Sequence, residues 1–375
     1  MFLSLFHRSP LLFNKTFLPK EFADPRRILL THFGSTADIV RSIPILVALR
    51  HRFPYADIAW LIAESGAPLV LDHWAINRFI VVRKNWLKHW SEIRRIRQRL
   101  QSFAPQVAID PQNSFESSFA TWLSNATYRV GLGGKQSRKL HNVRVKSDEK
   151  HRIERNLQLL QPFGIMGSGI GFDMPECEKD RLSARNILHH QGLHGHFALL
   201  NISAESSETR WQEERFGLVA KYLFDEWNLP SLVVWSGYEQ ESKRAESAVL
   251  AAHGTALKAP WTTLTERRSL SKLATLFVGA DITELQLAAA VGTHCVGLFG
   301  PASALENVPF GQVHRAVFGQ PEYERKKRRQ ASMQEWMNAI QPEMVCAMCD
   351  EVLTQISLPS PIPMQQVPPA PRRAA

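Results

Sequence analysis

The chain has 375 residues, a net charge of +10 and a sequence pI near 9.6, so it favours an anionic partner: nucleic acid, a phospholipid surface or a phosphorylated substrate. Hydrophobic residues make up 44% and charged residues 21%, which excludes a disordered chain, and the length favours two domains. No apolar run reaches the roughly 18 residues of a membrane-spanning helix, and the apolar N-terminus lacks the features of a signal peptide.

Residues 1–25 are expected to form a loosely attached arm, after which strands and helices alternate. Hydrophobic periodicity predicts strands over 26–33, 56–64, 78–83 and 105–110, and helices over 34–54, 66–74, 88–103, 114–124 and 151–165. The helix over 88–103 has one strongly basic face and one apolar face, made by Trp90, Ile93, Ile96, Leu100 and Phe103. The glycine-rich, basic stretch over 131–150 is predicted to be a mobile loop.

A linker over 166–180 is expected to precede a second run of alternating elements. Strands are predicted over 196–203 and 230–237, and helices over 211–227 and 239–254. Residues 273–311 then read as strand, loop, alanine-rich helix, strand and loop, which is a pattern that binds anionic ligands at strand ends. The alternation predicts two α/β domains with parallel sheets, over 26–165 and 181–356, before a disordered proline-rich tail at 357–375.

Cysteine and histidine spacing gives no metal site. Cys346 and Cys349 form a CxxC that can bind metal or do redox chemistry, but no second pair stands at metal-ligand spacing. On a helix the two thiols share one face, so the pattern favours simple packing. The histidines show no HxxxH or HExxH spacing, and we expect neither a metal nor a cofactor.

Several short segments carry a family-specific pattern. In the first half these are the small-residue turn before Asp38 and the segments Phe53 to Ile58, Ile109 to Gln112 and Arg129 to Leu132. In the second half they are the segments Thr209 to Phe216 and Asp281 to Pro301. Together they resemble the ADP-heptose:lipopolysaccharide heptosyltransferases, and the similarity covers roughly residues 26–356.

The resemblance implies a GT-B fold, in which two Rossmann-like domains with parallel sheets face a central cleft. It implies an inverting glycosyltransferase that moves a heptose, or a similar sugar, from an ADP-activated donor to a lipopolysaccharide core acceptor. The first domain would meet the acceptor and the second would hold the nucleotide diphosphate. The protein would be cytoplasmic, in peripheral contact with the inner membrane surface, and would bind no nucleic acid, because no signature for nucleic-acid binding is present.

Inverting transfer needs a carboxylate to take the proton of the acceptor hydroxyl, and positive groups to stabilise the leaving diphosphate. The resemblance assigns the base to Asp38, whereas spacing alone favours a helix cap, with Ser35 and Thr36 as rival caps. It assigns donor binding to Ser203, Thr209, Arg210, Glu239, Glu241, Asp281, Thr283, Glu284, Leu285 and Gln286. Acceptor binding is assigned to Ser35, Thr36, Gln112, Arg138 and Lys139.

The chain departs from the family pattern on the donor side. Thr209 stands where the family usually has a lysine, although Arg210 beside it supplies a charge, and Gln286 replaces a histidine. Thr283 stands in place of a glycine. These changes leave open an alternative, a catalytically weakened GT-B paralogue that acts as a sugar-nucleotide-binding or scaffold protein.

Overall fold

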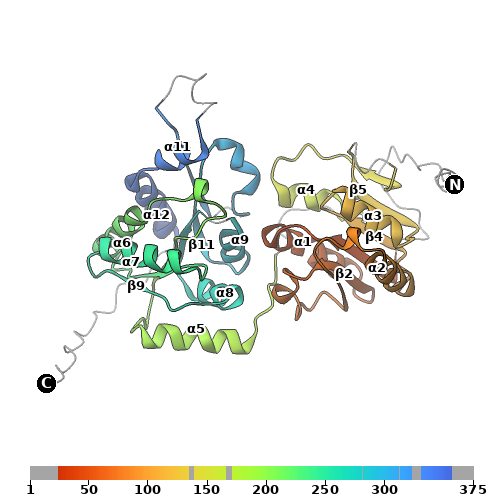
Figure 1. The fold of residues 1–375 in the computed structure, drawn as a ribbon, viewed down its shortest axis with the longest axis horizontal. Helices are drawn as coiled ribbons and strands as arrows, with labels where there is room; N and C mark the ends of the chain where they lie inside the picture. Colours follow the sequence, from red (N-terminus) through yellow and green to blue (C-terminus); the bar gives the residue numbers. More distant parts are fainter. Residues whose placement is uncertain are drawn as a thin grey trace.

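The computed structural model describes residues 24–134, 139–165, 171–280, 282–311, 313–322 and 331–356, which form two α/β lobes side by side (Figure 1). Each lobe contains a six-stranded parallel sheet, in the order β3-β2-β1-β4-β5-β6 in the first and β12-β11-β10-β7-β8-β9 in the second. Read from the opposite edge, the second order repeats the first, and both follow the doubly wound Rossmann pattern. The predicted α/β class with two parallel sheets is therefore confirmed.

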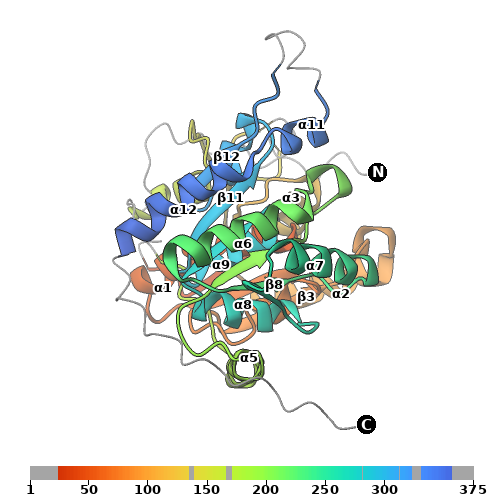
Figure 2. The same cartoon turned by 90° about the vertical axis from the view of Figure 1, so that its left-hand side faces the viewer.

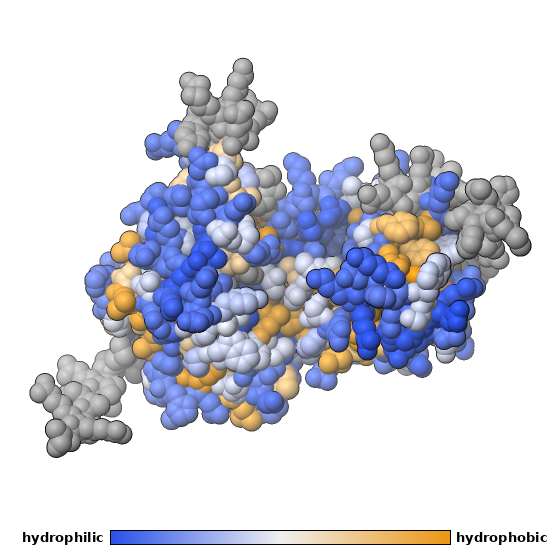
Figure 3. Space-filling model, in the orientation of Figure 1, coloured by the Kyte–Doolittle hydropathy of each residue, from blue (hydrophilic) through white to orange (hydrophobic). Residues whose placement is uncertain are grey.

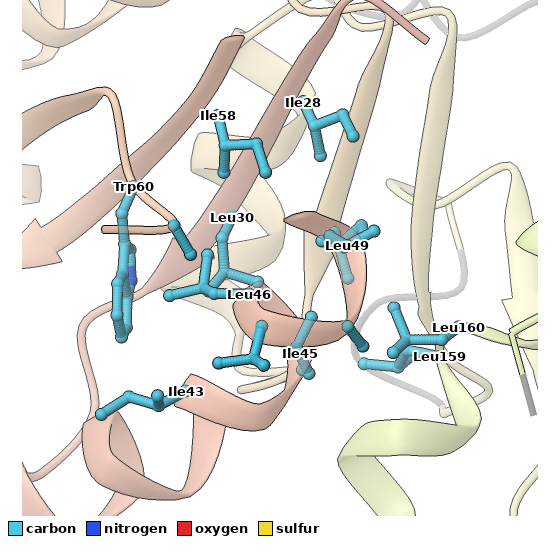
Figure 4. Close-up of a cluster of buried hydrophobic side chains, with 14 of the residues drawn as sticks. Ile28, Leu30, Ile43, Ile45, Leu46, Leu49, Ile58, Trp60, Leu159 and Leu160 are labelled. Atoms are coloured by element: carbon cyan, nitrogen blue, oxygen red, sulfur yellow. The ribbon is translucent and has the colours of Figure 1, made fainter. Parts of the chain in front are cut away.

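The strands of the first lobe are β1 (Arg27–His32), β2 (Asp57–Ala63), β3 (Arg78–Val82), β4 (Val107–Asp110), β5 (Tyr128–Leu132) and β6 (Val143–Val145). Its helices are α1 (Thr36–Arg52), α2 (Trp90–Phe103), α3 (Phe115–Leu123) and α4 (Arg152–Gln158), with short 3₁₀ turns η2 (Ala67–Leu69), η3 (Trp86–Lys88) and η4 (Gln161–Phe163). Figure 4 shows Leu30 and Ile58 of the sheet facing Leu46 of α1. The central strands are covered on both faces, which explains why they read as continuous apolar runs.

The strands of the second lobe are β7 (Ala198–Asn201), β8 (Ser231–Val234), β9 (Ala256–Lys258), β10 (Leu276–Gly279), β11 (His294–Phe299) and β12 (Arg315–Phe318). Its helices are α5 (Glu178–His190), α6 (Glu213–Trp227), α7 (Glu239–Ala251), α8 (Leu264–Leu273), α9 (Ile282–Ala290), α11 (Met333–Asn338) and α12 (Pro342–Ile356), with turns η5 (Ser207–Thr209) and η6 (Ala302–Asn307). Figure 2, which views this lobe end on, shows α6, α7, α8 and α12 distributed around the strands.

Four local predictions need correction. The helix expected over 66–74 is only the single turn η2, which ends at Leu69. The stretch 131–150 is not simply a loop, because β6 adds a sixth strand to the sheet there. Helix α5 begins at Glu178, inside the expected linker, and was missed because its sequence is mostly polar. Trp90, expected on the apolar face of α2, is 81% exposed.

The alanine-rich helix α9 joins the two lobes. Leu287 and Ala290 pack into the core of the first lobe, where α9 lies against α1. Leu285, Ala288 and Ala289 pack into a core cluster of the second lobe. Because small side chains allow close approach on two sides, one helix serves both cores, and the predicted helix at this position is confirmed.

The CxxC cysteines are buried in the second lobe. Cys346 and Cys349 lie on the inner face of α12 and belong to the core cluster beneath it. Burial raises the pKa of Cys346 to about 12 and raises that of Cys349 well above its ordinary value. The packing interpretation is confirmed, and the described residues contain no cluster of side chains suited to a metal ion. Within the same residues, no helix has the length and apolar character needed to cross a membrane.

Candidate active site

The carboxyl ends of the two sheets are turned toward each other. Helix α4, which follows β6, contacts the segment after β11: the His151 ring nitrogen Nε2 lies 2.9 Å from the Val308 carbonyl oxygen. Beside it, Arg152 Nε lies 3.6 Å from the Glu306 carboxylate. Figure 1 places α1 and α4 on the side of the first lobe that faces α9. Residues that follow strand ends in both lobes therefore share one contact zone, the position where open α/β sheets bind ligands.

Asp38 lies in this zone, in the first turn of α1. Ser35 is the N-cap of the helix, and its hydroxyl accepts a hydrogen bond from the Asp38 backbone N–H. The same hydroxyl donates to Asp38 Oδ2 at 2.8 Å. Ser35 thus caps the N-terminus of α1, so the Asp38 carboxylate is not needed as the helix cap. Thr36 is the first helical residue and is half-buried.

Two arginines hold the other carboxylate oxygen. Arg41, one helical turn along α1, donates from Nη1 to Asp38 Oδ1 at 2.8 Å and is almost wholly buried. Arg152 donates from its own Nη1 to the same oxygen at 3.0 Å. Because Arg152 also lies near Glu306, it connects the Asp38 carboxylate to the second lobe. The Asp38 side chain keeps 26% of its surface exposed, so a ligand can still reach it.

The surroundings of Asp38 make it an ionised carboxylate. Burial alone raises its pKa, but the Arg41 guanidinium, the Ser35 hydroxyl, His32 and the Arg152 guanidinium together hold the pKa below its ordinary value. Burial lowers the pKa of neighbouring His32 to about 4. At neutral pH the site therefore presents a charged carboxylate beside a neutral imidazole.

The loop after β4 lines a pocket at the same edge of the sheet as Asp38. Asp110 is buried and holds the loop by accepting from the Asn113 N–H and the Ser118 hydroxyl, each at 2.9 Å. Gln112 accepts from the Phe33 N–H at 2.8 Å, which joins the loop to the segment before α1. The pocket has a volume of about 360 Å³ and is lined by Pro111, Gln112, Asn113, Leu132, Gly133, Val145, Ser147 and Arg155. Gln112 was predicted from sequence to bind the acceptor.

Of the two other residues predicted to bind the acceptor, Arg138 and Lys139, the structure describes only Lys139. Lys139 is exposed, at the start of the segment that leads to β6. Arg138 lies outside the described residues. The structure thus gives the position of Lys139 and leaves both assignments as predictions.

On the donor side, the structure brings Ser203 and Glu241 together. Glu241 Oε2 accepts from the Ser203 hydroxyl at 2.9 Å, from the Ser236 N–H at 2.8 Å and from the Ser236 hydroxyl. The buried carboxylate therefore ties the loop after β7 to the loop after β8. Glu239 is separate: its side chain is 85% exposed and pairs with Lys243 at 3.2 Å.

Arg210 has an unused donor at the edge of this network. Its Nε is buried and has no hydrogen-bond partner among the described residues. Burial, and then the nearby charge of Arg244, lowers its pKa, while Glu213 and Glu241 oppose that shift. Thr209 is engaged locally, since its hydroxyl donates to the Ser206 carbonyl oxygen at 3.2 Å. The structure thus gives Arg210 a free donor atom, and its assignment to donor binding stays a prediction.

The first turn of α9 directs its polar side chains into the protein. Glu284 forms a buried ion pair with Arg267, with Nε and Oε1 2.6 Å apart. Leu285 is fully buried, and the Gln286 amide donates to the Asn307 carbonyl oxygen at 2.7 Å. Thr283 is half-buried, and Asp281 lies outside the described residues. Of the predicted donor set on this helix, Glu284, Leu285 and Gln286 contact protein in the structure.

Sequence reasoning missed four residues around Asp38. Arg41 had a signal, because its spacing of three residues places it one helical turn from Asp38. His32 also had one, as a polar residue at the end of a buried strand. Arg152 lies 114 positions away and Glu306 is in the other lobe, so nothing in the sequence pairs either with Asp38.

Two doubly wound lobes that meet at their strand ends around a carboxylate define a protein of the GT-B fold. A family model described as glycosyltransferase family 9 (heptosyltransferase) matches residues 93–337, and the chain belongs to this family. Lipopolysaccharide heptosyltransferase 1 of Salmonella typhimurium is 22% identical over 302 residues, which cover 73% of this chain and 88% of that protein.

Solved structures show the same fold. A glycosyl transferase family 9 structure from Veillonella parvula aligns with a TM-score of 0.75 and 19% identity, covering 88% of this chain and 98% of the other. E. coli heptosyltransferase WaaC with ADP-2-deoxy-2-fluoro heptose aligns with a TM-score of 0.66 and 19% identity, covering 87% and 99%. The overlap extends over both lobes, so the GT-B architecture that the resemblance implied is confirmed.

Proposed function

We propose that this protein transfers a heptose, or a similar sugar, from an ADP-activated donor to a lipopolysaccharide core acceptor, with Asp38 as the general base. The observation that carries the proposal is the accessible, ionised Asp38 carboxylate in the zone where the two lobes meet. The names of the similar proteins support the substrates, because one relative is a lipopolysaccharide heptosyltransferase and one neighbour contains an ADP-heptose analogue.

In the proposed reaction the acceptor hydroxyl approaches Asp38 and loses its proton as it attacks the anomeric carbon. Gln112 and the pocket beside it would hold the acceptor sugar, with Ser35, Thr36, Arg138 and Lys139 around it. The bond from the anomeric carbon to the diphosphate breaks as the new glycosidic bond forms. The negative charge that grows on the departing ADP would be stabilised by Arg210, whose Nε lacks a protein partner, and by N–H groups at the start of α9.

The remaining donor contacts are proposed as follows. The ribose hydroxyls would meet the loop that carries Glu239 and Glu241, and Ser203 would hold Glu241 in place. Thr209 and Thr283 would line the diphosphate, together with Asp281, while Gln286 would hold η6 beside it. The acceptor would be presented at the cytoplasmic face of the inner membrane, with which the protein makes peripheral contact.

Incubating the protein with a panel of nucleotide sugars and core-lipid acceptors tests this function. The expected product forms only with an ADP-linked heptose or a close analogue, and its anomeric configuration is inverted. Calorimetry with ADP and ADP-sugars accompanies the assay. Absence of ADP-sugar binding at every accessible concentration contradicts the proposal.

The alternative is a GT-B paralogue that binds a sugar nucleotide without turnover. It is favoured by the engagement of Glu284 and Gln286 with protein and by the threonine at position 209. For such a protein, calorimetry would give ADP-sugar binding while no acceptor in the panel is glycosylated. The two measurements together separate the enzyme from the binding protein.

Replacing Arg152 with glutamine should move the acid limb of the kcat/KM profile to higher pH. A base must be deprotonated to act, and Arg152 is one of the charges that hold the Asp38 pKa below its ordinary value. Without that charge the pKa of Asp38 rises, so activity is lost at a higher pH as the medium is acidified. Arg185→Gln is the control, because Arg185 is an exposed arginine on α5 of the second lobe and does not line the proposed acceptor pocket. Equal shifts in both variants would contradict a specific Arg152–Asp38 contact.

A further inference from the structure

The first lobe carries an aromatic cluster that begins in its core, where Trp86 is buried and Phe33, Phe119 and Trp122 pack against it, and continues to the surface at Phe115. The Phe115 and Phe119 rings stack 6.0 Å apart, and Phe119 stacks on Trp122 at 5.7 Å. Trp86 lies 6.3 Å from Phe119 and also meets Phe33 edge to face at 6.1 Å. We call these five residues the aromatic cluster; it runs continuously from the end of β1 across η3 to α3.

The cluster lies at the same edge of the sheet as Asp38. Phe33 directly follows the end of β1, Trp86 follows β3, and Phe115 opens the helix after β4. Because all strands of this sheet are parallel, these positions share the carboxyl edge that also carries the Asp38 loop. Phe33 is linked to the predicted acceptor residue Gln112 by the hydrogen bond from its N–H.

Part of this aromatic surface is open to solvent. Phe115 is 58% exposed, and Phe33, Phe119 and Trp122 are half-buried, while Trp86 lies beneath them. Trp90, the first residue of α2 and four positions after Trp86, is a second large exposed aromatic, at 81%. In Figure 3 a hydrophobic patch on the right occupies the position that α3 has in Figure 1, with hydrophilic residues below it. Large exposed aromatics gathered in this way mark an interaction surface.

A strongly basic segment, residues 83–99, adjoins the cluster through η3 and α2. It contains one carboxylate, Glu92, which pairs with Arg95, and seven cationic side chains: Arg83, Lys84, Lys88, Arg94, Arg95, Arg97 and Arg99. Seven positive charges against one negative leave +6, more than half of the net charge of +10 in the whole chain. All of the cations except Arg95 are exposed.

We propose that the aromatic cluster, Trp90 and the basic segment form a docking surface for an anionic phospholipid bilayer. Aromatic rings prefer the interface between headgroups and acyl chains, and lysine and arginine are attracted to the anionic headgroups around them. Single-stranded nucleic acid fits less well, because it needs free ring faces for its bases. Here the Phe115 and Phe119 rings already stack on each other, with their ring planes 10° apart.

This inference rests on the proposed function only in its purpose, which is to bring a lipid-linked acceptor to the enzyme. A surface that holds the bilayer at the carboxyl edge of the first sheet would bring a lipid-linked acceptor to the edge on which Asp38 lies. The bilayer contact itself needs neither donor nor transfer. The protein can therefore lack bilayer binding and still be a transferase, and it can bind a bilayer without being a transferase.

Co-sedimentation of the full chain with vesicles tests the surface. The protein should bind vesicles of phosphatidylcholine and phosphatidylglycerol in equal parts far better than vesicles of phosphatidylcholine alone, and salt should weaken the binding. Arg94→Gln/Arg97→Gln/Arg99→Gln should reduce the affinity roughly 100-fold, because each cation near an anionic surface contributes about 5-fold. Trp90→Ser/Phe115→Ser should reduce it about 10-fold. These five side chains are exposed, so the melting temperature should not change.

Two matched controls complete the test. Lys179→Gln/Arg185→Gln/Lys243→Gln removes three exposed charges from the second lobe, and Tyr55→Ser/Leu250→Ser removes two apolar side chains that are 98% and 75% exposed. Both should bind vesicles like the unaltered protein. The proposal is overturned if the unaltered protein ignores anionic vesicles, if a control loses as much affinity as its counterpart, or if oligo-uridine displaces the vesicles.

Discussion

Asp38→Asn should lower the rate of sugar transfer by about 10²–10⁴-fold, the contribution expected of a positioned general base. Asparagine keeps the shape of the side chain: its single oxygen can still accept from Arg41, and its NH2 group can donate to the Ser35 hydroxyl, but it cannot take a proton. Binding of an ADP-sugar should be nearly unchanged, because the proposed donor contacts lie in the second lobe. Initial rates with saturating acceptor, together with calorimetry on ADP, measure the two effects separately.

This substitution also removes the carboxylate that pairs with the buried Arg41, so stability has to be measured beside activity. A melt followed by circular dichroism shows whether the variant is folded at the assay temperature. Asp57→Asn is the matched control: Asp57 pairs with Arg78 at 2.8 Å, but it opens β2 at the opposite edge of the same sheet. The control should keep transfer within about 2-fold, since exposed ion pairs contribute little. An Asp38→Asn protein that is folded and fully active would refute the base assignment.

The fold was predictable because its strands are buried on both faces. The run of β2 consists almost wholly of apolar residues and β1 has an apolar centre from Ile28 to Leu30, and the polar turns between such strands mark the crossovers. Elements that depend on neighbours were not predictable. The strand β6 has three residues and exists because β5 pairs with it, and α5 is too polar for its periodicity to stand out.

The site was predictable only where it is local in sequence. Asp38 and its cap Ser35 lie within one turn, so a short motif contains both. Arg152 and Glu306 come close to Asp38 only when separate segments of the chain fold together. Spacing in the sequence does not predict these contacts. The first turn of α9 illustrates the reverse case, because it stands where the family has a donor motif while the packing around the helix engages the side chains of Glu284 and Gln286.

Glu284 separates these two interpretations of α9. Glu284→Gln should lower the free energy of unfolding by about 3–5 kcal/mol, because it leaves the Arg267 charge buried without its carboxylate. The two side chains are 7% and 9% exposed, so water cannot take the place of the lost partner. Denaturant unfolding followed by tryptophan fluorescence measures the change.

The double variant Arg267→Gln/Glu284→Gln should be less destabilised than the sum of its single variants, since both charges leave together. Glu239→Gln is the control, because it removes an exposed partner of Lys243 and should cost less than about 1 kcal/mol. If Glu284 instead contacts the donor directly, Glu284→Gln would unfold like the unaltered protein and bind ADP-sugars more weakly. A stable variant with normal ADP affinity would contradict both roles, because neither the ion pair nor the ligand would then depend on this carboxylate.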